Sequence, residues 1–298
     1  MEYMNVAEAA VKWNVSERSV RNYCFSGRVS GAVLDGKTWL IPKAAVKPER
    51  KKRAGQVPTD ILKRLKLEKE AGLAGGIYHK VQIELTYNSN HIEGSRLTHD
   101  QTRYIFETHT IGSQNEVLNV DDIVETANHF RCIDYIIELA NYSLSEALIR
   151  QLHFILKSGT SYSRRAWFAV GDYKRYENEV GGEETVRPSS VSREIKQLLK
   201  KYNKSKKKTF EEIVEFHYVF EKIHPFQDGN GRVGRLIMFK ECLRNGITPF
   251  IIEDNSKEFY YRGLKKWKNE RGYLLETCLA AQDKFKTYMD YFGLRYQD

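Results

Sequence analysis

Residues 224–235 read His-Pro-Phe-Gln-Asp-Gly-Asn-Gly-Arg-Val-Gly-Arg, and they combine a histidine, a carboxylate, glycines and two arginines in twelve positions. An apolar helical pattern ends at residue 223 and a second begins near residue 231, so the segment is expected to be a turn between two helices. The first amides of a helix have no partner within it, and glycines allow close approach. The start of the second helix is therefore suited to bind an anion, most naturally phosphate.

The side chains of this turn add to the phosphate site. Arg232 and Arg235 are three residues apart, so they emerge on the same side of the helix and can hold phosphate oxygens. Asp228 offers an oxygen ligand for magnesium, which proteins typically bind through one or two carboxylates plus substrate phosphates. His224 can accept a proton from an attacking hydroxyl near neutral pH, since its ordinary pKa is about 6.5. Phe226 is expected to anchor the turn in the core.

The same twelve residues resemble the signature of the Fic family, His-Pro-Phe-x-Asp/Glu-Gly-Asn-Gly-Arg-x-x-Arg, and match it at every specified position. The similarity covers roughly residues 78–292. It implies a protein adenylyltransferase, which moves AMP from ATP to a Ser, Thr or Tyr hydroxyl of a protein substrate with Mg²⁺ or Mn²⁺. The retained glycines and both arginines resemble the AMP-transferring members rather than the kinase-like relatives.

The resemblance also implies a role for each residue. His224 would be the general base, and Asp228 would hold the metal between the α- and β-phosphates. The α-phosphate would be oriented by Asn230 and the amides around Gly229 and Gly231. The β- and γ-phosphates would be bound by Arg232 and Arg235.

A second segment, Ser89-Asn90-His91-Ile92-Glu93-Gly94, resembles the Fic inhibitory motif Ser/Thr-x-x-x-Glu-Gly/Asn. It would lie at the end of an inhibitory helix over residues 78–94, where Glu93 would pair with Arg235 in the place of the γ-phosphate. Ser95 departs from the family, because many relatives have Asn there. In some relatives this glutamate also helps water remove AMP, so a deAMPylating or bifunctional enzyme stays open, as does a transcription regulator that senses nucleotide.

Three further groups of residues lie outside these two motifs. Residues 175–188 break the helical rhythm and resemble the flap that aligns the target backbone, with Lys174 where arginine is common and an acidic tip at Glu183 and Glu184. Tyr260 and Tyr261 are candidates to border the adenine. Two further histidines, His153 and His217, lie among apolar neighbours within helices and are interpreted as structural.

These residues must be positioned by a mainly α fold, a Fic-type helical bundle with a short β-hairpin flap. Apolar residues recur at three- and four-residue spacing almost throughout the chain beyond residue 55. The expected helices are 61–71, 78–92, 98–108, 120–139, 143–156, 191–202, 210–223, 231–245 and 258–292, the last broken near residue 272.

The first residues follow a different pattern. Helices are expected over 6–13, capped by Asn5, and over 16–26, followed by short strands around the Asp35-Gly36 turn. This arrangement resembles the winged helix-turn-helix modules of the MerR and excisionase type. The exposed face of the second helix would then contact DNA through Arg18, Arg21 and Asn22. The predicted domains are 1–46, a basic linker at 47–55, and a Fic domain at 56–298.

Composition limits the remaining classes. The chain has 298 residues and a net charge of +9, and residues 1–55 hold 11 Lys and Arg against 5 Asp and Glu, which favours a polyanionic partner there. The four cysteines lie far apart and predict neither a disulfide framework nor a zinc site. Neither a membrane span nor a secretion signal is present, so the expected compartment is the cytoplasm. A homodimer stays open.

Overall fold

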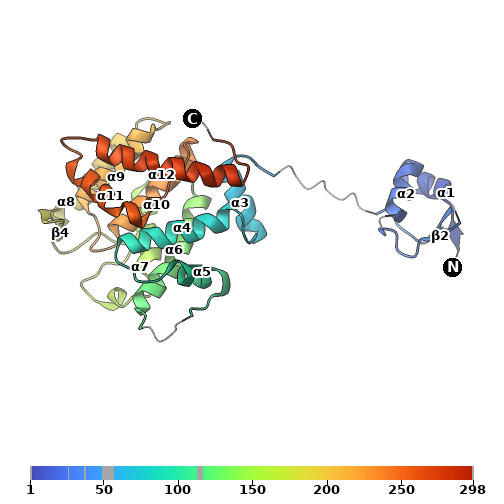
Figure 1. Ribbon diagram of the computed structural model, residues 1–298, viewed down its shortest axis with the longest axis horizontal. Helices are drawn as coiled ribbons and strands as arrows, with labels where there is room; N and C mark the ends of the chain where they lie inside the picture. Colours follow the sequence, from blue (N-terminus) through green and yellow to red (C-terminus); the bar gives the residue numbers. More distant parts are fainter. Residues whose placement is uncertain (1, 26, 37, 49–56, 113–116, 297–298) are drawn as a thin grey trace. The chain divides into compact units, whose positions relative to one another are not determined.

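The computed structural model describes residues 2–25, 27–36, 38–48, 57–112 and 117–296. It divides into two compact units, Met1–Val57 and Pro58–Asp298, each with its own core (Figure 1). Most of the predicted basic linker, residues 49–55, lies outside the described residues. Each unit is therefore described by itself.

The smaller unit packs two helices on a small antiparallel sheet. Its helices are α1 (Val6–Trp13) and α2 (Glu17–Phe25), and its strands are β1 (Tyr3–Met4), β2 (Val33–Asp35) and β3 (Thr38–Pro42), in the order β1-β3-β2. Asn5 and Glu8 form a capping box that starts α1. The sequence did not predict β1, since two residues are too short to show a strand pattern. It pairs with β3 through Met4 and Ile41.

The larger unit is mainly helical with one short hairpin, which confirms the predicted fold class (Figure 1). Its helices are α3 (Ile61–Ala71), α4 (Ile77–Ile92), α5 (His99–Thr108), α6 (Val120–Glu138), α7 (Glu146–Lys157), α8 (Pro188–Tyr202), α9 (Phe210–Ile223), α10 (Asn230–Asn245), α11 (Lys257–Lys266) and α12 (Gly272–Tyr291). Two short 3₁₀ turns, η1 (Tyr162–Arg164) and η2 (Asp254–Ser256), complete it. Among the described residues, no helix is long and apolar enough to cross a bilayer.

Two helix starts differ from the sequence prediction by three residues. The α7 helix begins at Glu146 rather than residue 143, because the Ser145 side chain accepts a hydrogen bond from the Leu148 amide and so caps it. The α8 helix begins at Pro188 rather than residue 191, since proline fits the first turn of a helix.

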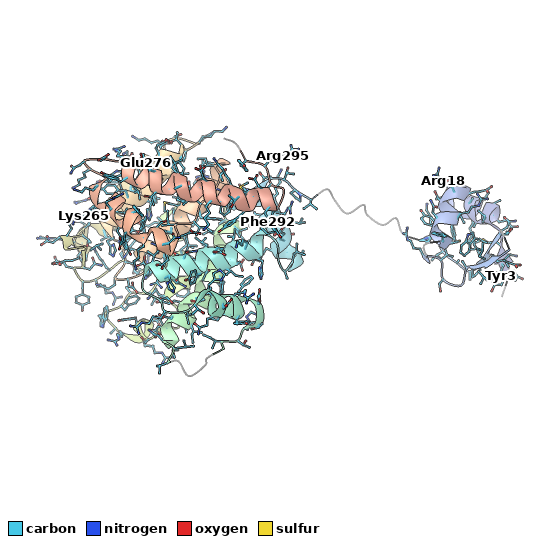
Figure 2. All side chains as sticks on the ribbon, in the orientation of Figure 1. Tyr3, Arg18, Lys265, Glu276, Phe292 and Arg295 are labelled. Atoms are coloured by element: carbon cyan, nitrogen blue, oxygen red, sulfur yellow. The ribbon has the colours of Figure 1, made fainter. Side chains whose placement is uncertain are left out.

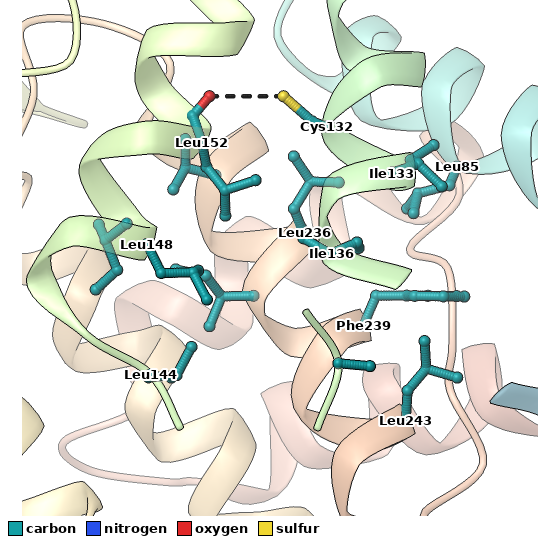
Figure 3. Packing of buried hydrophobic residues seen from close by; sticks show 14 of the residues in the cluster. Leu85, Cys132, Ile133, Ile136, Leu144, Leu148, Leu152, Leu236, Phe239 and Leu243 are labelled. Carbon is teal, nitrogen blue, oxygen red and sulfur yellow. Dashed lines mark hydrogen bonds between the residues drawn. The ribbon is translucent and has the colours of Figure 1, made fainter. Parts of the chain in front are cut away.

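Helix α10 is the centre of the larger unit and is buried from Asn230 to Leu243. It contacts α4, α6, α7 and α9. Figure 3 shows Leu236, Phe239 and Leu243 of this helix packed among apolar side chains of the neighbouring segments. The first turn of α10 is thus held by a core that surrounds the whole helix.

The hairpin consists of β4 (Glu179–Val180) and β5 (Glu183–Glu184). Its tip is Gly181 and Gly182, which both have positive φ, as a two-residue hairpin turn requires. The prediction that Glu183 and Glu184 form the tip is therefore wrong, because they lie in the returning strand. The reason is that consecutive glycines adopt this turn at the least steric cost.

Candidate active site

The loop between α9 and α10 begins at a strained residue. His224 is the C-cap of α9 and has a φ of 51°, a left-handed conformation that residues other than glycine seldom adopt. Its amide still donates to the Phe220 carbonyl at 2.9 Å. Gly229, with a φ of 83°, is the N-cap of α10 and turns the chain into the new helix. The loop therefore places the imidazole near the first amides of α10.

Phe226 and Asn230 hold the loop in this shape. The Phe226 ring is fully buried and stacks on His153 with centroids 4.0 Å apart. The Asn230 side chain accepts from the Phe226 amide at 2.8 Å and donates to its carbonyl at 2.9 Å. Both polar atoms of this buried amide are thus engaged within the loop. Asn230 therefore fixes the shape of the loop, and its role in orienting the α-phosphate stays a prediction.

The segment leading to the hairpin is tied to the same loop. The Lys174 amide donates to the Pro225 carbonyl at 2.8 Å, and the Asn178 side chain donates to the Phe226 carbonyl at 3.2 Å. Lys174 Nζ donates in turn to Asn178 Oδ1 at 2.7 Å. The hairpin and the loop are therefore positioned together.

Asp228 presents a charged carboxylate at the loop surface. Its Oδ1 accepts from the Gly229 amide at 2.7 Å, and its Oδ2 lies 2.5 Å from Lys157 Nζ and 3.5 Å from Arg232 Nη2. Burial raises the pKa of this carboxyl, but Arg232 and Lys157 outweigh that effect and hold the pKa well below its usual value.

The Asp228 carboxylate also meets the simplest requirement of a metal ligand. The side chain is 46% exposed, so an ionised oxygen faces outward and fits a divalent cation that takes its remaining ligands from phosphates. Within the described part of the chain, no cluster of three or more His, Cys, Asp or Glu could hold a metal without such help. Asp228 is therefore the residue that would hold Mg²⁺.

The structure brings Glu93, Ser89 and Arg235 together. Arg235 Nη2 donates to Glu93 Oε1 at 2.7 Å and to the Ser89 carbonyl at 2.9 Å, and its Nε lies 3.0 Å from Ser89 Oγ. A Cβ added at Gly231 would meet Glu93 Oε1 at 2.2 Å, so this carboxylate lies against the first turn of α10. Burial raises the pKa of Glu93, but the charges of Arg235 and Arg232 lower it by more. The pKa therefore lies below its usual value, and the carboxyl is ionised.

His224 is neutral at physiological pH. Burial, and then the charge of Lys174, lower its pKa to about 4, while 16% of the side chain remains exposed. Its Nδ1 lies 4.0 Å from Glu221 Oε2. Burial and the nearby Glu93 charge raise the pKa of Glu221 to about 8, so this carboxyl is protonated at pH 7. The imidazole can therefore accept a proton.

Sequence reasoning missed three ionisable residues around the loop, the buried Glu125 and Lys157 and the partly buried Glu221. Glu125 lies between Arg232 Nη1 and Lys157 Nζ and contacts both, and Glu221 lies beneath His224. The helical spacing of Glu125 and Lys157 could have indicated that both are buried. Glu125 falls on the same helical stripe as buried residues further along α6, and Lys157 is two helical steps after Ile149 on α7. A charge on an apolar stripe indicates a buried ion pair.

A cleft of about 480 Å³, within the range of small-molecule sites, lies against the hairpin and the last turn of α9, which leads into this loop. It is lined by Val180, Gly181, Glu183, Glu184, Thr185, Tyr218, Glu221, Lys222, Tyr261, Leu264 and Lys265. Tyr261 borders the cleft, and its hydroxyl donates to the Ile92 carbonyl at 3.2 Å. Tyr260 does not, because it is buried and its hydroxyl lies 2.7 Å from His217 Nε2. The expectation that Tyr260 borders the nucleobase is therefore wrong, and the one for Tyr261 stays a prediction.

The remaining sequence candidates lie elsewhere. His153 and His217 are buried and hydrogen-bonded, in keeping with structural roles. Arg18, Arg21 and Asn22 are exposed on α2 in the smaller unit, and Figure 2 labels Arg18. Arg21 pairs with Glu17 at 2.8 Å. All four cysteines are buried and free.

One family model matches the part of the chain that contains the loop. Residues 143–242 match the model of the Fic/DOC family. The protein adenylyltransferase Fic of Drosophila sechellia is 28% identical over 193 residues, and that of Drosophila mojavensis is equally similar. The match covers 60% of this chain and 36% and 35% of those relatives, so the chain spans about a third of their length.

Solved structures agree in fold. A Fic domain containing signaling protein from Bacteroides thetaiotaomicron superposes with a TM-score of 0.62 at 22% identity, over 80% of this chain and 98% of that one. Fic-1 residues 134–508 from C. elegans give a TM-score of 0.60 at 19% identity, over 78% of this chain and 72% of that one. These likenesses show the fold, and the similarity to the Fic/DOC family extends over residues 143–242, which include the α9–α10 loop.

Proposed function

We propose that this chain is a protein adenylyltransferase that transfers AMP from ATP to a Ser, Thr or Tyr hydroxyl of a protein. One observation carries the proposal: a neutral histidine, an ionised carboxylate and a helix N-terminus with two arginines meet at one loop beside a cleft. The curated relatives named protein adenylyltransferase Fic support the same activity.

The residues divide the reaction between them. The first amides of α10 hold the α-phosphate, and Arg232 and Arg235 hold the phosphates beyond it. The target oxygen bonds to the α-phosphorus while its proton passes to His224, and the bond to the β-phosphate oxygen breaks, releasing pyrophosphate. Asp228 would hold Mg²⁺, and the metal would neutralise charge on the phosphates. Tyr261 and Leu264 border the nucleobase, and the hairpin aligns the target strand.

Glu93 restrains this activity in the proposal. Its carboxylate lies against Gly231 and uses the Nη2 of Arg235, the group that would hold the γ-phosphate. Two anions cannot share this guanidinium at full strength, so bound ATP is displaced from the reactive pose. The protein is therefore expected to be nearly inactive while every catalytic residue is in place.

The test is labelling with ATP that carries the label on its α-phosphate, in the presence of Mg²⁺. Glu93→Gly is expected to raise labelling of protein at least about tenfold, which corresponds to about 1.4 kcal/mol of barrier. Adding His224→Ala to that variant is expected to abolish it, since the proton acceptor is lost. Equal labelling with and without Glu93 would overturn the restraint, and labelling that survives His224→Ala would overturn the assigned base.

The finer identity of the transferred group is tested on a modified target. Mass spectrometry distinguishes an added AMP from UMP or phosphate by mass. Incubating an AMP-modified target with the wild-type chain then shows whether AMP is removed, as in a deAMPylating or bifunctional enzyme. The adenylyltransferase proposal expects an AMP adduct on a hydroxyl side chain.

We also propose that the smaller unit binds DNA. Its second helix exposes Arg18, Arg21 and Asn22 on the face opposite the core residue Val20, as a recognition helix requires. Arg18→Ala is expected to weaken binding in a fluorescence anisotropy titration with duplex DNA. If the unaltered chain does not bind DNA, the proposal that the smaller unit is a DNA-binding domain is wrong. DNA binding that responds to ATP, without transfer to any protein, favours a nucleotide-sensing regulator.

A further inference from the structure

Lys157 is a buried cation beside the loop that the proposed reaction does not use. It is the last residue of α7, and its side chain is only 1% exposed. The ammonium contacts Glu125 Oε1 and lies 2.5 Å from Asp228 Oδ2. Its stem passes beneath Gly229, where an added Cβ would meet Lys157 Cδ at 3.6 Å. Lys157 is therefore fixed under the carboxylate that faces the phosphate site.

Four charged side chains form a ring of ion pairs beside the loop. Glu125 contacts both Lys157 and Arg232, and Asp228 Oδ2 lies near the same two cations. Two positive and two negative groups thus alternate, and the set is neutral. Without Lys157 it would carry one negative charge, in a site that has to accept an anion. Coulomb repulsion at such short range is large where water is excluded.

We propose that Lys157 is a built-in counter-cation of Asp228, which lets the loop bind the diphosphate of a nucleotide without a divalent metal. Lys157 is a positioning residue, because its ammonium is enclosed and acts through Asp228 and Glu125. The inference rests on the proposed function only in that the loop binds a nucleotide. It predicts that the metal serves the transfer step, while nucleotide binding requires little of it.

The experiment measures the Kd of ADP by calorimetry on the full chain, once with excess EDTA and once with Mg²⁺. ADP is chosen because it has no γ-phosphate and so does not compete with Glu93. The unaltered chain is expected to bind ADP with Kd values within about threefold of each other in the two conditions. Lys157→Met is expected to weaken binding in EDTA at least about tenfold, as removal of a buried ion-pair partner does, and to recover with Mg²⁺.

Two further variants separate charge from structure. Lys157→Gln keeps hydrogen-bond donors but removes the charge, so it is expected to behave like Lys157→Met. Lys157→Arg keeps the charge and is expected to retain binding in EDTA. Lys208→Met is the matched control, because Lys208 is also buried but precedes α9, at the end of that helix opposite His224. It is expected to leave the ratio of the two Kd values unchanged.

The outcomes distinguish this inference from the function beneath it. If no variant and no condition shows ADP binding, the proposed nucleotide site fails. If ADP binds and Lys157→Met weakens binding equally in EDTA and Mg²⁺, or not at all, the counter-cation role is overturned. Metal-dependent binding by the unaltered chain overturns it as well.

Discussion

His224 combines a strained backbone with a buried ring, and both follow from its place at the end of α9. The left-handed conformation ends the helix and directs the chain into Pro225. Residues that hold such conformations at functional sites are stabilised by their surroundings, here by the buried Phe226 and the Asn230 amide. Because burial and Lys174 lower its pKa to about 4, the ring is neutral through the physiological range.

This pKa predicts the acid limit of transfer. The Glu93→Gly variant is expected to keep its rate down to about pH 5 and to lose it as pH falls through the His224 pKa of about 4. Removing the positive charge with Lys174→Met stabilises the protonated ring, so the limit is expected to move to higher pH. Initial rates between pH 4 and 8 measure both, with Lys174→Arg as the charge-preserving control. An identical limit in all three proteins would contradict the assignment of His224.

At the scale of elements, α9 and α10 approach each other closely at Gly234. A Cβ added there would meet His217 Nδ1 at 2.6 Å and Glu221 Oε1 at 2.8 Å. His217 is fully buried and the Oε1 atom of Glu221 is buried as well, so an added methyl group would press on both. The two helices that carry the loop can thus approach this closely because Gly234 has no side chain.

Gly234→Ala is therefore expected to destabilise the larger unit by about 1 to 3 kcal/mol through overpacking. The usual gain of alanine over glycine inside a helix is smaller, about 1 kcal/mol. Gly272→Ala is the matched control, because the nearest atom there is Glu276 Oε1 at 3.9 Å. Urea denaturation measures both. A Gly234→Ala protein as stable as the control would show that the helices can separate without cost.

The elements themselves were largely predictable, and the reasons are local. Capping boxes at Asn5 and Thr98 fix helix starts within a few residues of sequence. The loop at 224–235 was predictable because its residues are contiguous. Glu125 and Lys157 were not, because their partners are up to 107 residues away and only the fold brings them together. The engagement of Asn230 within the loop likewise depends on the three-dimensional path of residues 226–230.

In the whole molecule, the two units differ in their histidine content. All eight histidines lie in the larger unit, and burial lowers the pKa of His129, His153 and His217 to about 3. His224, at the candidate site, behaves alike with a pKa of about 4. In the unfolded chain these rings titrate near 6.5, so between about pH 6.5 and 4 the unfolded state binds more protons. Stability of the larger unit therefore falls as pH falls through this window.

Each of these histidines contributes about 1.4 kcal/mol per pH unit within the window. Scanning calorimetry of the full chain at pH 7, 6 and 5 is expected to show the transition of the larger unit moving to lower temperature. The transition of the smaller unit, which has no histidine, is expected to stay in place. Equal shifts of the two transitions would show that the units do not unfold separately or that other groups dominate.

Under the proposed restraint, the contact between Glu93 and Arg235 also sets how large a signal must be to activate the protein. Because α10 is buried from Asn230 to Leu243, movement at the end of α4 is the expected route of release. Under the proposed restraint, raising the released population from about 1% to about 99% requires a partner that prefers the released form about 10⁴-fold, or about 5.5 kcal/mol. One exposed ion pair supplies about 1 kcal/mol at most. An activator is therefore expected to bind α4 over an extended surface, because a simple ion in solution would supply too little binding free energy.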